Sequence, residues 1–242
     1  MRTTQTDMNR TGAATSPIHT KAMEKAAQTF KGPPGSESAM GEIREAYSTG
    51  ADPIGTVPIP TTIKGAAGTA GKALTGQFLS VLVDKLGERL AFERQGARLY
   101  EALLCKLEVS PARVGSITPV ALTEIMNEEI SHAGLLIEEM NGLGADPTAM
   151  TPSADLAGVQ AIGLVQTITD PRTSMTQCLQ AILAAELIDN ACWELLIELA
   201  EGFGKDELAA NMRVALRQEE EHLRRVRGWL TEYVQSEAGI SP

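Results

Sequence analysis

The 242-residue sequence is short of the residues that several common protein classes require. Its three cysteines (Cys105, Cys178 and Cys192) are an odd number without CxxC spacing, which excludes a disulfide framework and a four-thiolate metal site within one chain. No stretch of about 18 uncharged apolar residues is present, and the N-terminal stretch up to Phe30 contains no apolar segment typical of a signal peptide. We therefore expect a cytoplasmic protein with no membrane partner.

Basic residues are also scarce. Lys and Arg total 21 against 31 Asp and Glu, so the net charge is −10. Such a chain lacks the basic footprint that binds phosphate backbones, and we expect no nucleic-acid partner. The segment 1–76 has a small excess of basic over acidic groups, so the acidity belongs to the C-terminal part.

The N-terminal segment 1–76 is poor in large apolar side chains and rich in Thr, Ser, Gly, Ala and Pro. A segment of this composition buries too little apolar surface to offset its ordering entropy. Two stretches, residues 17–30 and 38–47, have weak helical periodicity. We predict a flexible, largely irregular N-terminal arm over residues 1–76 and one folded domain over residues 77–242.

The folded domain has the apolar periodicity of four long helices. We expect them at about residues 71–107, with an apolar stripe that begins at Leu79, and at residues 119–142, 175–200 and 206–234. Thr118-Pro119 is a typical helix start, with a hydroxyl N-cap and proline in the first turn. Residues 143–174 form a long connection with one modest amphipathic piece near 156–168. The pattern predicts an all-α four-helix bundle with one long crossover between its second and third helices.

Two of the three histidines lie three residues after a glutamate in the middle of an expected helix. These pairs are Glu129 with His132 and Glu219 with His222. A three-residue step places both side chains on one helix face about one turn apart, so each pair can bind one metal ion. The third histidine, His19, lies in the arm.

The other two helices carry single glutamates at matching heights. Glu93 and Glu129 are equally far along the chain from Pro111, one before it and one after it, so an antiparallel hairpin that turns there places both at one level. Glu186 and Glu219 flank Phe203 in the same way, with separations that differ by a single position.

The two halves of the domain also repeat. Tyr100 follows Glu93 by seven residues, as Trp193 follows Glu186, and each half then has its Glu-x-x-His pair. An approximate two-fold repeat of helical hairpins would bring four glutamates and two histidines together in the bundle centre. Buried carboxylates are costly without a cation, so we interpret Glu93, Glu129, His132, Glu186, Glu219 and His222 as ligands of two metal ions.

Several neighbours of these six residues have two interpretations. Tyr100 and Trp193 are either core packing or redox-active aromatic side chains near the metals. Asp189 either faces solvent or accepts a hydrogen bond from a ligand imidazole. Three further glutamates adjoin the ligands in sequence, and we expect them to be surface charge: Glu128, Glu220 and Glu221.

The six-residue pattern resembles the ferritin-like family of di-iron or di-manganese carboxylate proteins, which includes bacterioferritins and rubrerythrins. The resemblance covers residues 77–236 and none of the arm. It implies that Glu93 and Glu186 are terminal ligands, that Glu129 and Glu219 bridge, and that His132 and His222 each bind one metal. Tyr100 also matches the tyrosine that ferritins carry after their first ligand, so we assign it a catalytic role.

The resemblance implies an oxidoreductase of the ferroxidase or peroxidase type, with two iron ions as cofactor and O2 or H2O2 as oxidant. Mixed carboxylate and imidazole ligands suit both Fe(II) and Mn(II), so manganese remains open. Rubrerythrins carry a rubredoxin module with two CxxC pairs, which this chain lacks, so its electron donor would be external. The ligand set is more symmetric than that of manganese catalases.

Two other function classes remain open. One is a non-catalytic protein that binds or stores iron, or docks a partner; the other is a di-iron oxygenase that acts on an organic substrate. Ferritin shells come from chains without such an arm, and no fifth helix is evident after residue 234. A generic bacterial ferritin-like protein is the best overall match. The weakly basic arm and the acidic domain permit a homo-oligomer.

Overall fold

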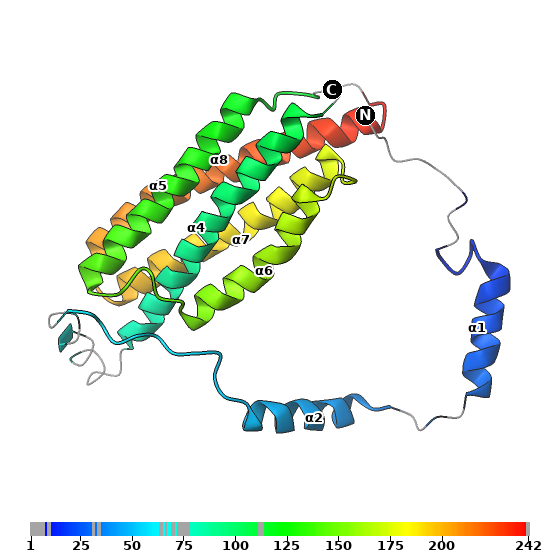
Figure 1. Ribbon diagram of the computed structural model, residues 1–242, viewed down its shortest axis with the longest axis horizontal. Helices are drawn as coiled ribbons and strands as arrows, with labels where there is room; N and C mark the ends of the chain where they lie inside the picture. The colour runs from blue at the N-terminus through cyan, green and yellow to red at the C-terminus, as the bar shows by residue number, and fades with distance from the viewer. Residues whose placement is uncertain are drawn as a thin grey trace. The chain divides into compact units, whose positions relative to one another are not determined.

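The computed structural model describes residues 8, 11–30, 32, 35–62, 65, 67–68, 71, 78–110 and 114–240. The described residues form helices and no strands (Figure 1). None of the helices in this part of the chain is long and apolar enough to cross a membrane.

The four expected bundle helices are confirmed. They are α4 (Leu79–Glu108), α5 (Pro119–Leu143), α7 (Met175–Gly202) and α8 (Asp206–Glu237). The Thr118 hydroxyl accepts a hydrogen bond from Ala121 N at 3.1 Å, as its N-cap position predicts. Ser174 and Gln177 form a capping box at the start of α7. In Figure 1 α4 and α5 form one hairpin, and α7 and α8 form a second. The figure also shows that α5 and α8 run in opposite directions.

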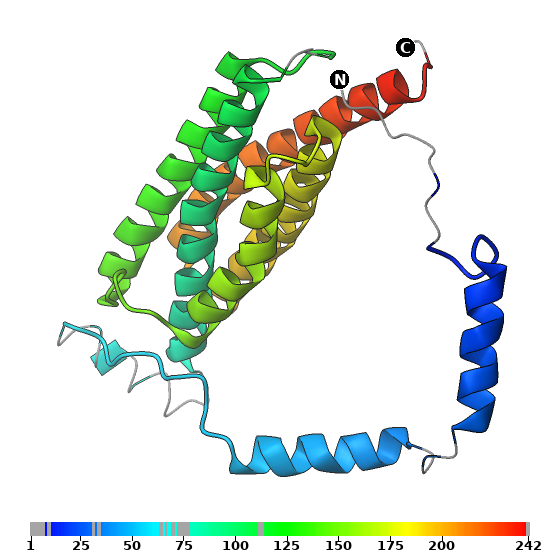
Figure 2. The same cartoon turned by 45° about the vertical axis from the view of Figure 1, so that its right-hand side comes forward.

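The crossover is more regular than the sequence predicts, because its amphipathic piece is part of an 18-residue helix, α6 (Pro152–Thr169). The Thr151 hydroxyl caps this helix as Thr118 caps α5. Helix α6 contacts α4 and α7 (Figure 2). It buries mainly alanines, which give a weak periodic signal. Its start approaches α4 closely, since a Cβ at Gly87 would lie 2.6 Å from Thr151 Oγ1.

The apolar core consists of two clusters. On α5, α7 and α8, the predicted ligands lie between residues of one cluster and residues of the other, and on α4 Glu93 lies near the same transition. Tyr100 and Trp229 belong to the first cluster, and Leu86 and Trp193 to the second. The ionisable residues therefore form a layer closed on both sides by apolar side chains.

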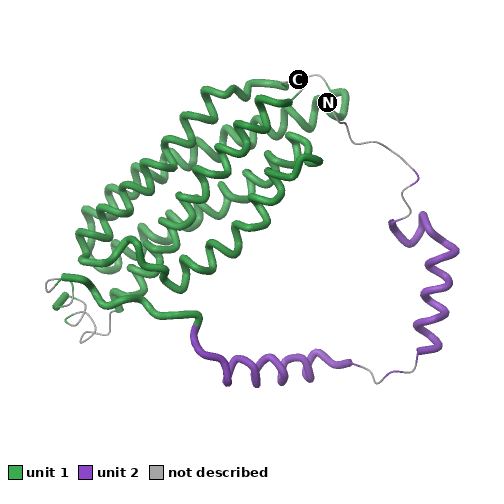
Figure 3. The backbone as a smooth tube through the Cα atoms, viewed as in Figure 1, with its two compact units in different colours: residues 1–2, 54–242 green, residues 3–53 purple. Residues whose placement is uncertain are grey.

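The chain divides into two compact units, Thr3–Pro53 and Ile54–Pro242 (Figure 3). The expected boundary between residues 76 and 77 lies outside the described residues. Within the larger unit, Thr61 N and Thr61 Oγ1 both donate to Gly144 O, at 2.7 and 3.0 Å. Residues near Thr61 are thus attached to the end of α5.

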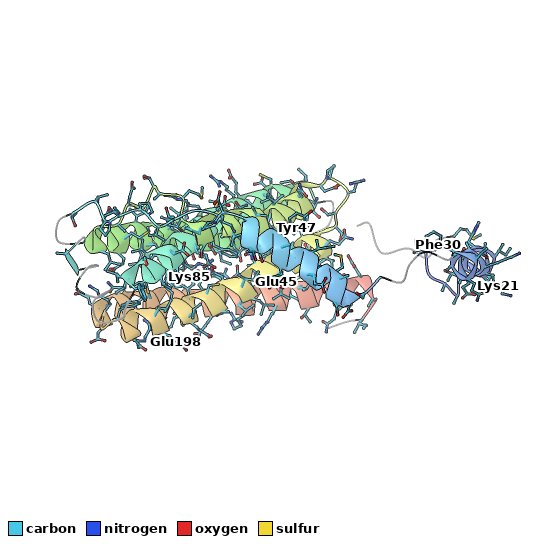
Figure 4. The ribbon with its side chains drawn as sticks, turned by 90° about the horizontal axis from the view of Figure 1, so that it is seen from below. Lys21, Phe30, Glu45, Tyr47, Lys85 and Glu198 are labelled. Atoms are coloured by element: carbon cyan, nitrogen blue, oxygen red, sulfur yellow. The ribbon has the colours of Figure 1, made fainter. Side chains whose placement is uncertain are left out.

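The smaller unit contains α1 (Pro17–Thr29) and α2 (Glu37–Gly50), at the two stretches with weak helical periodicity. Neither helix buries a residue, and the aromatic side chains of Phe30 and Tyr47 are exposed (Figure 4). His19 on α1 is exposed as well.

Candidate metal centre

All six predicted ligands come together in the middle of the bundle. Each bundle helix contributes at least one of them, and none is more than 3% exposed: Glu93 from α4, Glu129 and His132 from α5, Glu186 from α7, and Glu219 and His222 from α8. The hairpin spacing therefore predicts their common level correctly.

The six residues form two groups whose ligand atoms lie within 4.8 Å of one another. One group is Glu93, His132 and Glu219, and the other is Glu129, Glu186 and His222. This grouping differs from the expectation that each Glu-x-x-His pair serves one ion. Because α5 and α8 run in opposite directions, the glutamate of one pair lies level with the histidine of the other.

Glu219 lies between the two imidazoles. His132 Nδ1 is 2.6 Å from Glu219 Oε1, and His222 Nδ1 is 3.1 Å from Glu219 Oε2. Each Nδ1 also faces a second glutamate at 3.5 Å, Glu93 for His132 and Glu129 for His222. The Nδ1 atoms are thus the nitrogen donors that point into the centre.

Several of these ligand atoms have no hydrogen-bond partner although they are buried. Among the described residues these include Glu93 Oε2 and Glu186 Oε2, while Glu219 Oε1 and His132 Nδ1 contact each other as an ion pair. Unsatisfied buried carboxylate oxygens are costly, and a cation would satisfy them. The oxygen and nitrogen donors suit Fe(II) and Mn(II), so the residues fit the metal pair that the sequence predicts.

Gly96 leaves room for one of the carboxylates. It lies one turn after Glu93 on α4, and a Cβ at this position would collide with the carboxylate of Glu129 on α5. The side chain of Glu129 therefore occupies space that any other residue at position 96 would take.

Two aromatic side chains hold the single glutamates. The Tyr100 hydroxyl donates to Glu186 Oε1, and Trp193 Nε1 donates to Glu93 Oε1 at 3.0 Å. Tyr100 and Trp193 are buried, so these contacts are shielded from water. In each case the second oxygen of the glutamate stays free for a cation.

Arg89 is a buried residue of the site that the sequence analysis missed. Its Nε lies 3.0 Å from Glu93 Oε1, and its terminal nitrogen lies 2.7 Å from Asp189 Oδ1. Asp189 therefore pairs with a guanidinium. The two interpretations from the sequence placed it in solvent or beside a ligand imidazole, but it is buried and contacts Arg89. The spacing of Arg89 four residues before Glu93 on one helix face was the available signal.

Glu128 is not simple surface charge, which corrects the expectation for it. Its Oε2 lies 2.7 Å from His222 Nε2, and Gln218 Oε1 lies 3.0 Å from His132 Nε2. Gln218 Nε2 also donates to Glu128 Oε1 at 3.0 Å. Glu220 and Glu221 are exposed, as expected.

Without metal, the centre holds protons. Burial and the neighbouring glutamates raise the pKa of Glu129 well above its usual range, and burial with Glu219 raises the pKa of Glu186 to about 8. Burial lowers the pKa of both histidines, but the facing carboxylates outweigh it and raise the pKa of His132 to about 10 and of His222 to about 9. Burial raises the pKa of Glu219, but the two imidazoles and Asp189 outweigh it and lower its pKa overall.

Comparison with known protein families agrees with this geometry. Residues 121–235 match the family model of the ferritin-like domain. This stretch of the helical bundle is similar to the ferritin-like domain. The matched region includes every predicted ligand except Glu93, which lies on α4, before residue 121.

Among solved structures, this chain is similar to a ferritin-like, di-iron carboxylate protein from Bacillus anthracis strain Ames. The two chains are 18% identical with a TM-score of 0.47, and the similarity covers 63% of this chain and 96% of that one. No curated protein matches this chain.

Proposed function

We propose that the helical bundle holds two iron ions and oxidises Fe(II) with O2 or H2O2, as an oxidoreductase of the ferroxidase or peroxidase type. One observation carries this proposal: two buried groups, each of two glutamates and one histidine, contain ligand atoms without a hydrogen-bond partner. Two ferrous ions together supply two electrons, which suffice to reduce O2 to peroxide or H2O2 to water.

In this proposal the six residues have three roles. Glu93 and Glu186 are terminal ligands, because an aromatic donor occupies one oxygen of each and leaves the other free. His132 and His222 each bind one ion through Nδ1. Glu219 and Glu129 would each help to hold both ions, and the contacts of Glu219 with both imidazoles support this role.

Other residues of the chain prepare the site for this chemistry. The four ligand carboxylates balance the charge of two divalent cations, which offsets the cost of burying the centre. The Arg89–Asp189 ion pair adds no net charge. Bound iron supplies the redox change, and Tyr100 holds Glu186 in place beside it. The position of Tyr100 supports a further role as a redox-active side chain next to the oxidised iron.

The partners of this activity remain proposals. Turnover with H2O2 requires an electron donor, and we propose an external one because the chain has no CxxC pair. Manganese is the alternative metal. Cys105, Cys178 and Cys192 are free thiols, which supports a reducing cytoplasmic location. A homo-oligomer also remains a proposal.

The test combines elemental analysis of protein purified without added metal with stopped-flow absorbance. Metal-free protein is mixed with two equivalents of Fe(II) in air, and ferric iron is followed in the near ultraviolet. We expect about two bound metal ions and rapid oxidation in the wild type, and loss of both in Glu129→Ala and Glu219→Ala. Glu138→Ala removes an exposed glutamate from the same helix as Glu129 and serves as the control.

Either of two results would overturn the proposed activity. Stable binding of two ions without Fe(II) oxidation would leave an iron-binding or storage protein. Absence of both metal binding and Fe(II) oxidation would show that the six residues do not form a metal centre.

A further inference from the structure

The two histidines of the centre differ in what contacts their outer ring nitrogens. His222 Nε2 faces the carboxylate of Glu128 at 2.7 Å, whereas His132 Nε2 faces the amide oxygen of Gln218 at 3.0 Å. Glu128 and Gln218 immediately precede Glu129 and Glu219, so they occupy equivalent positions of the two-fold repeat. A negative charge thus stands in one half of the repeat where a neutral amide stands in the other.

The hydrogen bond between the two outer residues fixes the orientation of the amide. Because Gln218 Nε2 donates to Glu128 Oε1, Gln218 Oε1 is left to accept from His132 Nε2. The neutral His132 therefore carries its proton on Nε2. With a cation in the centre, His222 would do the same toward Glu128, and both imidazoles would present the Nδ1 lone pair to the centre. A carboxylate acceptor makes an imidazole a stronger ligand than an amide acceptor does.

The environments of Glu93 and Glu186 also favour stronger metal binding in the group that contains His222. Glu93 Oε1 lies against the cationic Arg89 as well as accepting from Trp193, and Arg89 withdraws electron density from this ligand. Glu186 Oε1 accepts from the neutral Tyr100 hydroxyl. The group of Glu93, His132 and Glu219 is thus bordered by a guanidinium and an amide, and the other group by a phenol and a carboxylate.

We infer that the two metal positions of the proposed centre bind divalent cations with unequal affinity, and that the Glu128–Gln218 pair sets the order. This inference rests on the proposed two-metal function. The position formed by Glu129, Glu186 and His222 fills first. Changes to residues that contact metal ligands from outside alter metal affinity by about 10- to 100-fold, so exchange of these two side chains is enough to reorder the positions. Glu128 and Gln218 act as positioning residues and touch no metal themselves.

The test is an anaerobic titration of metal-free protein with Mn(II), in which electron paramagnetic resonance reports free Mn(II). This measurement needs no turnover. We expect the wild type to bind two ions with affinities that differ by at least about 10-fold beyond the statistical factor. Glu93→Gln retains the stronger step and loses the weaker one, and Glu186→Gln does the opposite.

The outer pair is then exchanged. Glu128→Gln weakens the first step by about 10-fold, and the double exchange of Glu128→Gln with Gln218→Glu, which keeps one amide and one carboxylate in contact, reverses the order of filling. Glu138→Gln removes the same charge from an exposed site on α5, about 15 Å along the helix from residue 128, and leaves both affinities unchanged.

Each other outcome is decisive. Equal affinities in the wild type, or a Glu128→Gln variant that behaves like Glu138→Gln, would overturn the inference and leave the two-metal function intact. A double exchange that leaves the order of filling unchanged would also overturn it, and this variant keeps the net charge of the pair. A wild type that binds neither Mn(II) nor Fe(II) would instead overturn the proposed function.

Discussion

Tyr100 on α4 and Trp193 on α7 hold each other's glutamates. Tyr100 lies seven residues after Glu93 but donates to Glu186, and Trp193 lies seven residues after Glu186 but donates to Glu93. The exchange follows because α4 and α7 are antiparallel. The glutamate of one helix therefore lies level with the aromatic residue two turns further along the other. The two aromatic positions are thus parts of the site and not only core packing.

The two aromatic contacts differ in how much depends on them. Glu93 Oε1 accepts from Trp193 and also forms an ion pair with Arg89, whereas Glu186 Oε1 accepts from the Tyr100 hydroxyl. We expect Tyr100→Phe to lower metal affinity at the Glu186 position by about 10-fold and to slow Fe(II) oxidation, with a smaller effect from Trp193→Phe. Mn(II) titration and stopped-flow oxidation measure both. An equal effect of the two variants would contradict this difference, and Tyr47→Phe in the arm is the control.

Substitution of Gly96 separates metal binding from folding. In Gly96→Ala the new methyl group takes the space of the Glu129 carboxylate, and this flexible side chain moves away. We expect loss of at least one bound metal ion while the helical circular dichroism spectrum is retained. Gly163→Ala is the matched control, because a Cβ at Gly163 on α6 meets nothing within 4 Å. Normal metal content in Gly96→Ala would show that the collision is relieved elsewhere.

The Arg89–Asp189 pair stabilises the fold as well as the site. Arg89→Met leaves the buried Asp189 without its cation, and loss of one partner of a buried ion pair costs about 3–5 kcal/mol. We expect a fall of this size in the free energy of unfolding of metal-free protein, measured by urea denaturation. Adding Asp189→Leu to Arg89→Met should recover part of it. Arg98→Met, on the exposed face of α4, should change it little.

The metal-free protein should lose stability as pH rises. The folded pKa values of His132, His222 and Glu186, about 10, 9 and 8, all exceed the usual values of these groups. Between pH 6.5 and 9 the folded state therefore binds more protons than the unfolded state, and the free energy of unfolding falls with pH. The lowered pKa of Glu219 acts only below about pH 4.5, outside this window.

Bound metal should remove this dependence. Metal binding requires neutral histidines and ionised glutamates, so the loaded centre has no protons to lose in this window. We expect thermal midpoints of metal-free protein to fall from pH 6.5 to 9, by about 2–4 °C per kcal/mol, and those of metal-loaded protein to stay level. A metal-free midpoint that rises over this range would contradict the assigned pKa directions.

The common level of the six ligands could be predicted from the sequence because it depends only on helix rise and the turn positions. Glu93 and Glu129 are equidistant from their turn, and straight antiparallel helices preserve that relation. The contacts of Glu128 could not be predicted in this way, because they depend on how α5 faces α8. The full extent of α6 could not be predicted either, because small alanines line its buried face.

Each of the two ligand groups contains residues from both hairpins, so metal binding would depend on the whole bundle. The hairpin of α4 and α5 supplies two ligands to one group but only Glu129 to the other, and the hairpin of α7 and α8 supplies the remaining three. Neither hairpin alone completes the coordination of even one ion. A bound ion would therefore link the two hairpins, and a chain in which only one hairpin had formed would hold neither ion firmly.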